Sequence, residues 1–178
     1  MSGIYQPSED SFLLSEFVKE EIKKNNITKV LDMGSGQGIQ AETSIKSGIN
    51  PESIVLVDIN QEAIKSLKKK FPKSKIILSD LFSGISRKSG FDLIIFNPPY
   101  LPENKFDKEP DTSGGKNGSG IINQFLEQAK KYLSENGRIL LLTSSFTKGI
   151  GWQNYNKELL GKRRIFFENL YVWRLRNK

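Results

Sequence analysis

The 178-residue sequence contains no cysteine and no histidine. This excludes disulfide scaffolds, thiolate zinc sites, cysteine nucleophiles and every mechanism that pairs serine or cysteine with histidine. We therefore expect no metal site in this chain. An enzyme built from it must work with carboxylates, amides, lysines or a bound cofactor.

Long apolar stretches are also missing. The longest runs, at residues 93–96 and 139–142, are far shorter than the roughly 20 residues of a membrane-spanning helix, and the first residues lack a signal-peptide pattern. The composition, with 37% hydrophobic and 26% charged residues, is that of a folded chain. We expect a soluble, cytoplasmic protein with no membrane partner and a single domain covering residues 1–178.

The charge is unbalanced. The chain has 27 basic and 20 acidic residues, a net charge of +7, and residues 151–178 contain only Glu158 and Glu168 as acids. This excess fits an acidic or nucleic-acid partner, and it equally fits lysines that serve only solubility.

Short apolar runs alternate with amphipathic segments, which is typical of a parallel α/β sheet. The first helix is expected to start after Ser8, with Glu9 and Asp10 at its positive end, and to end near Asn25. Its predicted buried residues are Phe12, Leu14, Phe17, Val18 and Ile22. Apolar runs predict five parallel strands, at residues 30–33, 54–59, 75–79, 93–96 and 139–143. Helical spacing predicts helices at residues 39–46, 61–71 and 121–132, with a weaker candidate at residues 81–88.

The remaining segments are less regular. Residues 153–160 form a polar helix candidate, and residues 164–167 and 171–175 predict an antiparallel hairpin that turns at residues 168–169. With this hairpin the expected fold is a Rossmann-like, mostly parallel seven-stranded sheet with helices on both faces. The polar, Gly-rich residues 102–120 predict a functional lid or a disordered segment.

Three glycines follow the first predicted strand and precede a helix. They are Gly34, Gly36 and Gly38, and Asp32 lies two residues before the first of them. Glycine allows positive φ and a close approach of a ligand to the backbone. The spacing and the neighbouring acid disfavour a pyrophosphate and favour a ligand that carries an ammonium group.

Two further acids, Asp58 and Asp80, follow the next two strands. An acid at the end of the second strand grips a ribose diol in doubly wound folds, and the third suits an adenine amine. Each feature alone is as well explained by a tight turn or a helix cap. Together they predict S-adenosylmethionine as the cofactor, with its amino acid, ribose and adenine bound in sequence order.

The fourth strand ends in the most specific motif of the chain, Asn97, Pro98, Pro99 and Tyr100. Two prolines remove backbone donors and stiffen the turn. The Asn97 side-chain oxygen and the Pro98 carbonyl can then accept two hydrogen bonds from one planar NH₂ group, while Tyr100 offers a ring to a flat amide or base. We predict these four residues to be catalytic through positioning and electrostatics. A turn merely capped by Asn97 is the structural alternative.

From Tyr5 to about residue 143 the sequence resembles the HemK-type glutamine methyltransferases. These class I enzymes use S-adenosylmethionine to methylate the side-chain amide nitrogen (N5) of the glutamine in the Gly-Gly-Gln motif of class-1 peptide-chain release factors. The matching segments are residues 5–14, the glycine motif that includes Gly36, Asp58, residues 80–81, residues 97–100 and residues 114–118. By position, the resemblance implies cofactor contacts for Ser11, Asp32, Gly34, Asp58, Asp80, Leu81 and Asn97. It implies that Asn97, Pro98 and Tyr100 hold the substrate glutamine and that Tyr5 helps to close the pocket.

The chain lacks the N-terminal helical domain of the bacterial members and resembles the short archaeal and eukaryotic type. Members of that type depend on a small zinc-binding activator protein, which implies a heterodimer. In class I order the strand at residues 75–79 lies at an open, apolar edge, where we expect the activator to add a strand. It would also cover apolar surface on the helix that carries Ile64 and Leu67. The alternative is a competent monomer whose edge is protected by Lys73 and Lys75.

Two other functions compete with this interpretation. The same Asn-Pro-Pro-Tyr turn can hold the amine of adenine, so an N6-adenine methyltransferase acting on DNA or RNA is the first alternative, although little of the chain is left to grip and flip a base. A non-catalytic nucleic-acid-binding module is the second. Its basic patch would be Lys65, Lys68, Lys69, Lys70, Lys73 and Lys75.

Overall fold

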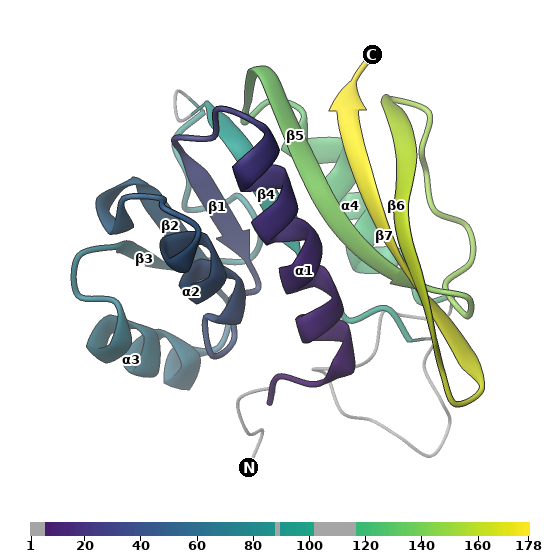
Figure 1. The fold of residues 1–178 in the computed structure, drawn as a ribbon, viewed down its shortest axis with the longest axis horizontal. Coiled ribbons are helices and arrows are strands. Elements are labelled where there is room, and N and C mark those ends of the chain that lie inside the picture. The colour runs from purple at the N-terminus through teal and green to yellow at the C-terminus, as the bar shows by residue number, and fades with distance from the viewer. Residues whose placement is uncertain (1–5, 88–89, 102–116) are drawn as a thin grey trace.

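The computed structural model describes residues 6–87, 90–101 and 117–178, and a seven-stranded sheet forms its centre (Figure 1). The strands are β1 (Val30–Met33), β2 (Ile54–Asp58), β3 (Lys75–Leu78), β4 (Phe91–Phe96), β5 (Leu133–Ser144), β6 (Tyr155–Ile165) and β7 (Glu168–Asn177). Their order is β3-β2-β1-β4-β5-β7-β6. The first five are parallel, whereas β7 pairs antiparallel with both β5 and β6. The predicted sheet and its closing hairpin are confirmed.

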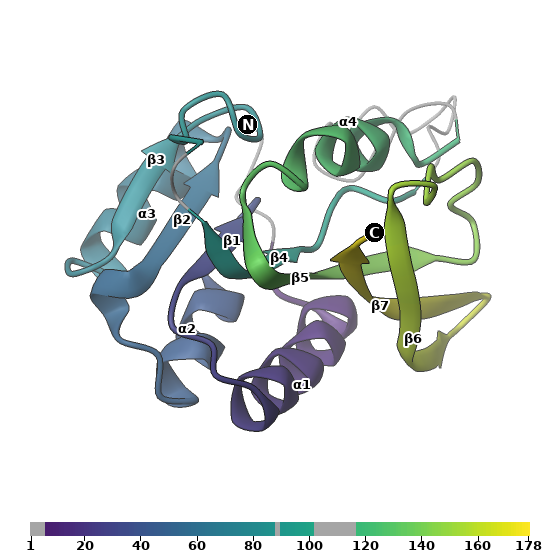
Figure 2. The same ribbon diagram turned by 90° about the horizontal axis from the view of Figure 1, so that it is seen from above.

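Helices cover both faces of this sheet, as predicted. They are α1 (Glu9–Lys24), α2 (Ile39–Lys46), α3 (Gln61–Lys70) and α4 (Gly120–Ala129), with a short 3-10 turn at Pro51–Ser53 before β2. Figure 2 shows α4 over one face and α1 and α2 under the other. The core accordingly forms two layers, one around Phe125 of α4 and one around Leu14 and Val18 of α1.

The central strands are buried on both sides. Every residue of β1 and β2 is buried, and β4 is buried except at Asp92. Uninterrupted apolar runs are what such strands require, which is why the sequence located them correctly. The helix predicted at residues 61–71 ends one residue earlier, and the one predicted at residues 121–132 ends at Ala129.

Helix α1 starts after Ser8 and ends before Asn25, as predicted, but one of its predicted core residues is wrong. Phe12 is 54% exposed. The buried stripe of the helix runs through Leu14 and Val18, and at 100° per residue this phase turns Phe12 toward solvent.

The C-terminal segment departs from the prediction. The polar helix candidate at residues 153–160 is wrong, because these residues enter strand β6. Cross-strand contacts with β7 stabilise the strand: Lys157 lies over the ring of Trp173 at 5.1 Å, and Glu158 pairs with Arg174 at 2.7 Å. The hairpin also turns two residues earlier than expected, at Phe166 (φ +49°) and Phe167.

Two other expectations concern loops. The weak helix candidate at residues 81–88 is wrong over residues 81–87, where i→i+3 bonds such as Ile85 N to Phe82 O form turns. Of the expected lid, residues 102–116 lie outside the described residues, and Gly120 already begins α4. None of the helices in the described part of the chain is long and apolar enough to span a membrane.

A buried carboxylate fastens the second half of α1 to the sheet. Glu21, only 3% exposed, accepts from Arg138 of β5 at 2.8 Å and from Arg174 of β7 at 2.9 Å. These two ion pairs connect the helix to strands that follow it by more than a hundred residues. They thereby hold the last turn of α1 against β5 and β7.

We predict that Glu21→Ala lowers the free energy of unfolding by about 3–5 kcal/mol, because it removes the buried counter-charge of Arg138 and leaves Arg174 with only the exposed Glu158. The matched control is Glu20→Ala, which removes an exposed pair with Lys24. Thermal and urea unfolding should show a large loss for the first variant and none for the second. Equal losses would mean that the buried pairs do not hold the helix.

Candidate active site

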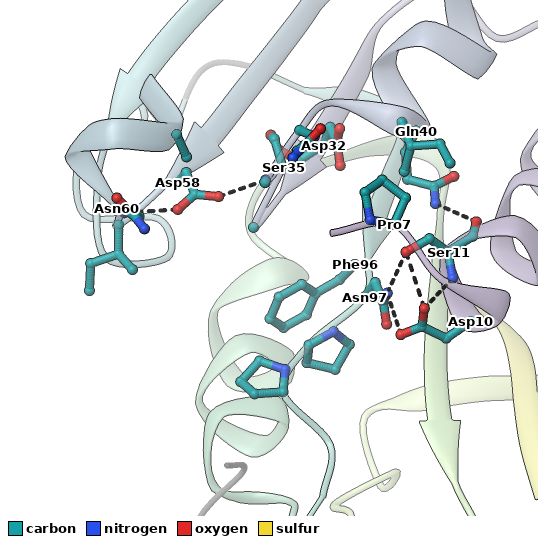
Figure 3. Close-up of a pocket in the computed structure, with 18 of the residues that line it drawn as sticks. Pro7, Asp10, Ser11, Asp32, Ser35, Gln40, Asp58, Asn60, Phe96 and Asn97 are labelled. Atoms are coloured by element: carbon teal, nitrogen blue, oxygen red, sulfur yellow. Dashed lines mark hydrogen bonds between the residues drawn. The ribbon is translucent and has the colours of Figure 1, made fainter. Parts of the chain in front are cut away.

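A cavity of about 300 Å³ opens at the carboxyl ends of β1, β2 and β4 (Figure 3). The first turn of α1 and the segment before it contribute Pro7, Asp10 and Ser11 to its wall. Because β2 and β4 flank β1 on opposite sides, this is the switch point where open α/β sheets bind ligands. The predicted site residues that line it are Ser11, Asp32, Gly34, Gly36, Asp58, Asn97, Pro98, Pro99 and Tyr100.

The glycine loop after β1 forms one wall of the cavity. Gly34 and Gly36 have φ of +62° and +51°, a conformation that L side chains rarely adopt. A Cβ on Gly34 would also lie 3.4 Å from the ring of Phe96. These glycines leave the backbone open to a ligand that approaches closely.

Asp58, at the end of the neighbouring strand β2, holds this loop through a hydrogen bond. Its Oδ2 accepts from the Gly36 backbone N–H at 2.7 Å, and its Oδ1 accepts from that of Asn60 at 2.8 Å. The side chain is largely buried yet lines the cavity. Asp58 therefore shapes the loop as well as facing the ligand space, which the sequence had not indicated.

Asp32 is buried at the end of β1, where its Oδ2 accepts from the Ala41 backbone N–H at 3.2 Å. Burial raises the pKa of this carboxyl to about 7, and the nearby charge of Asp58 adds to the rise, while the bond from Ala41 opposes it. The cost of ionising Asp32 falls when a cation enters the cavity, so a positively charged ligand is favoured.

The overall charge of the cavity points the same way. Asp10, Asp32 and Asp58 line it, and no lysine or arginine does so among the residues that the structure describes. Such a lining repels phosphates and attracts cations. It suits the sulfonium and ammonium groups of S-adenosylmethionine. The open glycine loop leaves room for the amino-acid part of this cofactor.

The Asn-Pro-Pro-Tyr turn forms the opposite wall. The Asn97 amide nitrogen donates to Asp10 Oδ2 at 3.0 Å, whereas the Asn97 Oδ1 atom is buried and has no hydrogen-bond partner in the described part of the chain. The turn is anchored behind by Thr147 Oγ1, which donates to the Tyr100 carbonyl at 3.0 Å. A fixed, unsatisfied oxygen in a cavity wall is an acceptor prepared for a ligand donor.

The structure does not bring every predicted residue to the cavity. Asp80 and Leu81 are not among the residues that line it, although Asp80 is exposed near the end of β3. Leu81 is buried with φ +45°, and its carbonyl accepts from Ser79 Oγ at 3.1 Å. Tyr5 lies outside the described residues.

Sequence reasoning missed the part that Asp10 plays. It treated Asp10 as one of two acids at the positive end of a helix, but this side chain is only 4% exposed and lines the cavity. Its immediate neighbour Glu9 is exposed. Two adjacent acids in the first turn of a helix cannot be distinguished from the sequence alone. In the structure Asp10 is the one that binds Asn97.

The raised pKa of Asp32 has a testable consequence for the apo chain. Since the folded state holds this proton up to about pH 7 and the unfolded state loses it near pH 4, wild-type stability contributed by Asp32 is lost as the pH rises between these values. Asp32→Asn removes this loss. We predict that the melting temperature of the variant minus that of the wild type increases from pH 5 to pH 8. A difference that is constant with pH would contradict this.

Comparisons with known proteins agree with this geometry. Residues 10–165 match the family model described as the methyltransferase small domain. The chain is 33% identical to a proposed protein N5-glutamine methyltransferase of Methanocaldococcus jannaschii, over 97% of this chain and 92% of the relative. It is 35% identical to the release factor glutamine methyltransferase of Borreliella burgdorferi, over 76% of this chain and 51% of the relative. The chain thus spans about half the length of that bacterial protein.

A solved structure extends the match to three dimensions. One chain of the E. cuniculi Mtq2–Trm112 complex, which is responsible for methylation of the eRF1 translation termination factor, matches with a TM-score of 0.77 and 25% identity. The match covers 100% of this chain and 100% of that chain. The chain therefore belongs to the methyltransferase small domain family, as a HemK-type methyltransferase of the short archaeal and eukaryotic type that uses S-adenosylmethionine.

Proposed function

We propose that this enzyme methylates the side-chain amide nitrogen of the glutamine in the Gly-Gly-Gln motif of a class-1 release factor. The observation that carries the proposal is the buried, unpartnered Oδ1 of Asn97 in the wall of an acidic cavity. The relatives named as glutamine or release factor methyltransferases supply the substrate class.

In this proposal the cavity has two halves with separate tasks. Asp32, Asp58 and the glycine loop bind the cofactor. When bound, the cofactor would supply a methyl group on a sulfonium. As the N–C bond formed, the electron pair of the C–S bond would go to sulfur, and the amide nitrogen would release one proton to water. Asn97 Oδ1 and the Pro98 carbonyl accept the two N–H groups of the substrate amide, and the Tyr100 ring supports its plane. These contacts direct the nitrogen lone pair toward the methyl group and supply catalysis by orientation.

The substrate test uses mass spectrometry. A class-1 release factor is incubated with the enzyme and labelled S-adenosylmethionine, beside a release factor whose motif glutamine is replaced by glutamate and beside DNA and RNA oligonucleotides. The proposal expects one methyl group on the glutamine amide and none in the control. Methylation of adenine alone would replace the proposed substrate by a nucleic acid.

We predict that Asn97→Ala lowers the single-turnover rate roughly 10²- to 10³-fold, the cost of losing one preorganised contact to the reacting group. The affinity for the release factor should change much less. Asn156→Ala, an exposed position on β6, is the control and should retain the wild-type rate. An Asn97→Ala enzyme that keeps half of its rate would remove this residue from the mechanism.

We also propose that a small partner protein adds a strand at β3. This strand is at the edge of the sheet, and Leu78 on it is 53% exposed. Ile59, which follows the neighbouring strand β2, is 70% exposed. The solved relative is a complex with Trm112, which supports a small partner. One detail of the sequence prediction is wrong: Ile64 and Leu67 of α3 are buried within the chain and offer no apolar face to a partner.

Two exposed leucines on opposite edges of the sheet test this position. We predict that Leu78→Asp on β3 weakens co-purification with a Trm112 homologue from the same source, because a charge would be buried in the interface. Leu159→Asp on β6, where the leucine is 45% exposed, should not. Hydrogen exchange at residues 75–78 should slow when the partner is added. Loss of binding by Leu159→Asp alone would place the partner at the other edge.

Two finer points belong to the same proposal. The partner is zinc-binding, and since this chain has neither cysteine nor histidine, metal analysis of the complex should assign all zinc to the partner. The release factor is a translation protein, so we place the activity in the cytoplasm.

A further inference from the structure

The side-chain amide of Asn97 has a defined orientation, and Asp10 sets it. An amide can be turned to exchange its nitrogen and oxygen, but a carboxylate only accepts hydrogen bonds. With Asp10 Oδ2 3.0 Å away, the nitrogen of Asn97 must face Asp10. Figure 3 shows this bond between Asn97 and Asp10. The oxygen is then at the other end of the amide, where it is buried and has no hydrogen-bond partner among the described residues.

The same oxygen atom of Asp10 holds the other end of the turn. The hydroxyl of Tyr100 donates to Asp10 Oδ2 at 3.3 Å. Asn97 and Tyr100 flank the two prolines, so one carboxylate oxygen fixes two of the three residues that we assign to the substrate. Asp10 comes from α1, eighty-seven residues before Asn97, and does not belong to the turn.

Asp10 is itself rigidly held. Its other oxygen, Oδ1, accepts from Ser8 Oγ at 2.8 Å, from Ser11 Oγ at 3.1 Å and from the Ser11 backbone N–H. The side chain is 4% exposed, so water does not compete for these bonds. A carboxylate fixed at both oxygens is able to fix its neighbours in turn.

We propose that Asp10 is a positioning residue for methyl transfer, which keeps the oxygen of Asn97, and not its NH₂ group, turned toward the substrate nitrogen. This inference rests on the proposed function, in which the acceptor is an NH₂ group. An Asn97 nitrogen in that place would meet the substrate donor to donor and repel it. The charge of Asp10 also polarises the amide through its hydrogen bond, which strengthens the oxygen as an acceptor while the reacting nitrogen becomes positive.

The test starts from Asp10→Asn, which keeps the shape but can donate as well as accept. The Asn97 amide can then adopt either orientation. We expect kcat to fall roughly 10- to 100-fold, the loss typical of removing a group that orients a ligand-contacting residue. Binding of S-adenosylhomocysteine, for which Asp32 and Asp58 remain, and KM for the release factor should change much less than kcat. A variant that keeps more than half of the wild-type kcat would overturn the proposal.

Two further variants separate positioning from folding. Exchanging the pair, Asp10→Asn with Asn97→Asp, again places an acceptor oxygen toward the substrate in either orientation, and it should recover at least part of the rate that Asp10→Asn loses. Asp10→Glu keeps the charge but moves the carboxylate by one methylene, and it should fold, bind S-adenosylhomocysteine and transfer slowly. Full activity of Asp10→Glu, or no recovery in the exchanged pair, would reject the positioning role.

Asp92→Asn is the matched control. Asp92 lies at the start of β4, and its Oδ2 accepts hydrogen bonds from Thr28 and Lys29. Like Asp10 it is a carboxylate with several hydrogen bonds, but it does not line the cavity. We expect a change in stability without a change in kcat. If the wild-type enzyme methylates no release factor but another NH₂ acceptor, the proposed substrate fails and the Asp10 variants are measured with that acceptor. If every variant loses rate in proportion to its folded fraction, Asp10 is only structural.

Discussion

Helix α1 is held against the sheet by a buried carboxylate in its first turn and another in its last, and the site depends on both. Glu21 pairs with Arg138 and Arg174, whereas Asp10 accepts from the neutral donors of Asn97 and Tyr100. The first carboxylate contributes stability through buried ion pairs, and the second contributes orientation. Because a helix is stiff over this length, the ion pairs at one end help to hold Asp10 beside Asn97 and Tyr100 at the other.

The acidic lining of the cavity has a cost in the absence of ligand. Asp32 is buried close to Asp58, and burial together with this like charge raises its pKa to about 7. A cation that enters the cavity therefore offsets mainly the cost of burying this charge and, to a smaller extent, the repulsion from Asp58. The oxygens of Asp58 accept hydrogen bonds from two backbone N–H groups.

The sequence predicts the parts of this molecule that depend on local rules. Buried strands β1 and β2 appear as continuous apolar runs, and glycines with positive φ appear as the loop that follows β1. Errors arise where long-range contacts decide. Residues 153–160 contain good helix formers, yet β7 pairs with them as a strand. Phe166 takes the turn with φ +49°, although local propensity favours other residues there.

The same limit explains the two errors that bear on function. Nothing near Asp10 in the sequence separates it from Glu9, because its hydrogen-bond partners Asn97 and Tyr100 are about ninety residues away. The apolar spacing of α3 was likewise correct, but the prediction expected apolar surface on this helix to meet a partner protein. In the structure Leu67 packs into the core beside Gly38. The fit is so close that a Cβ added to Gly38 would lie 2.9 Å from the Leu67 side chain.

The two edges of the sheet differ in the features that prevent pairing with another strand. Strand β6 presents exposed charged residues, including Lys157, Glu158 and Lys162, and its register shifts near Gly161. Charges and bulges are the usual devices that prevent pairing at an edge. Strand β3 has only four residues, with Lys75 at its start and exposed Leu78 at its end. Its backbone edge is short but lacks these devices beyond Lys75, so pairing with another strand costs least there.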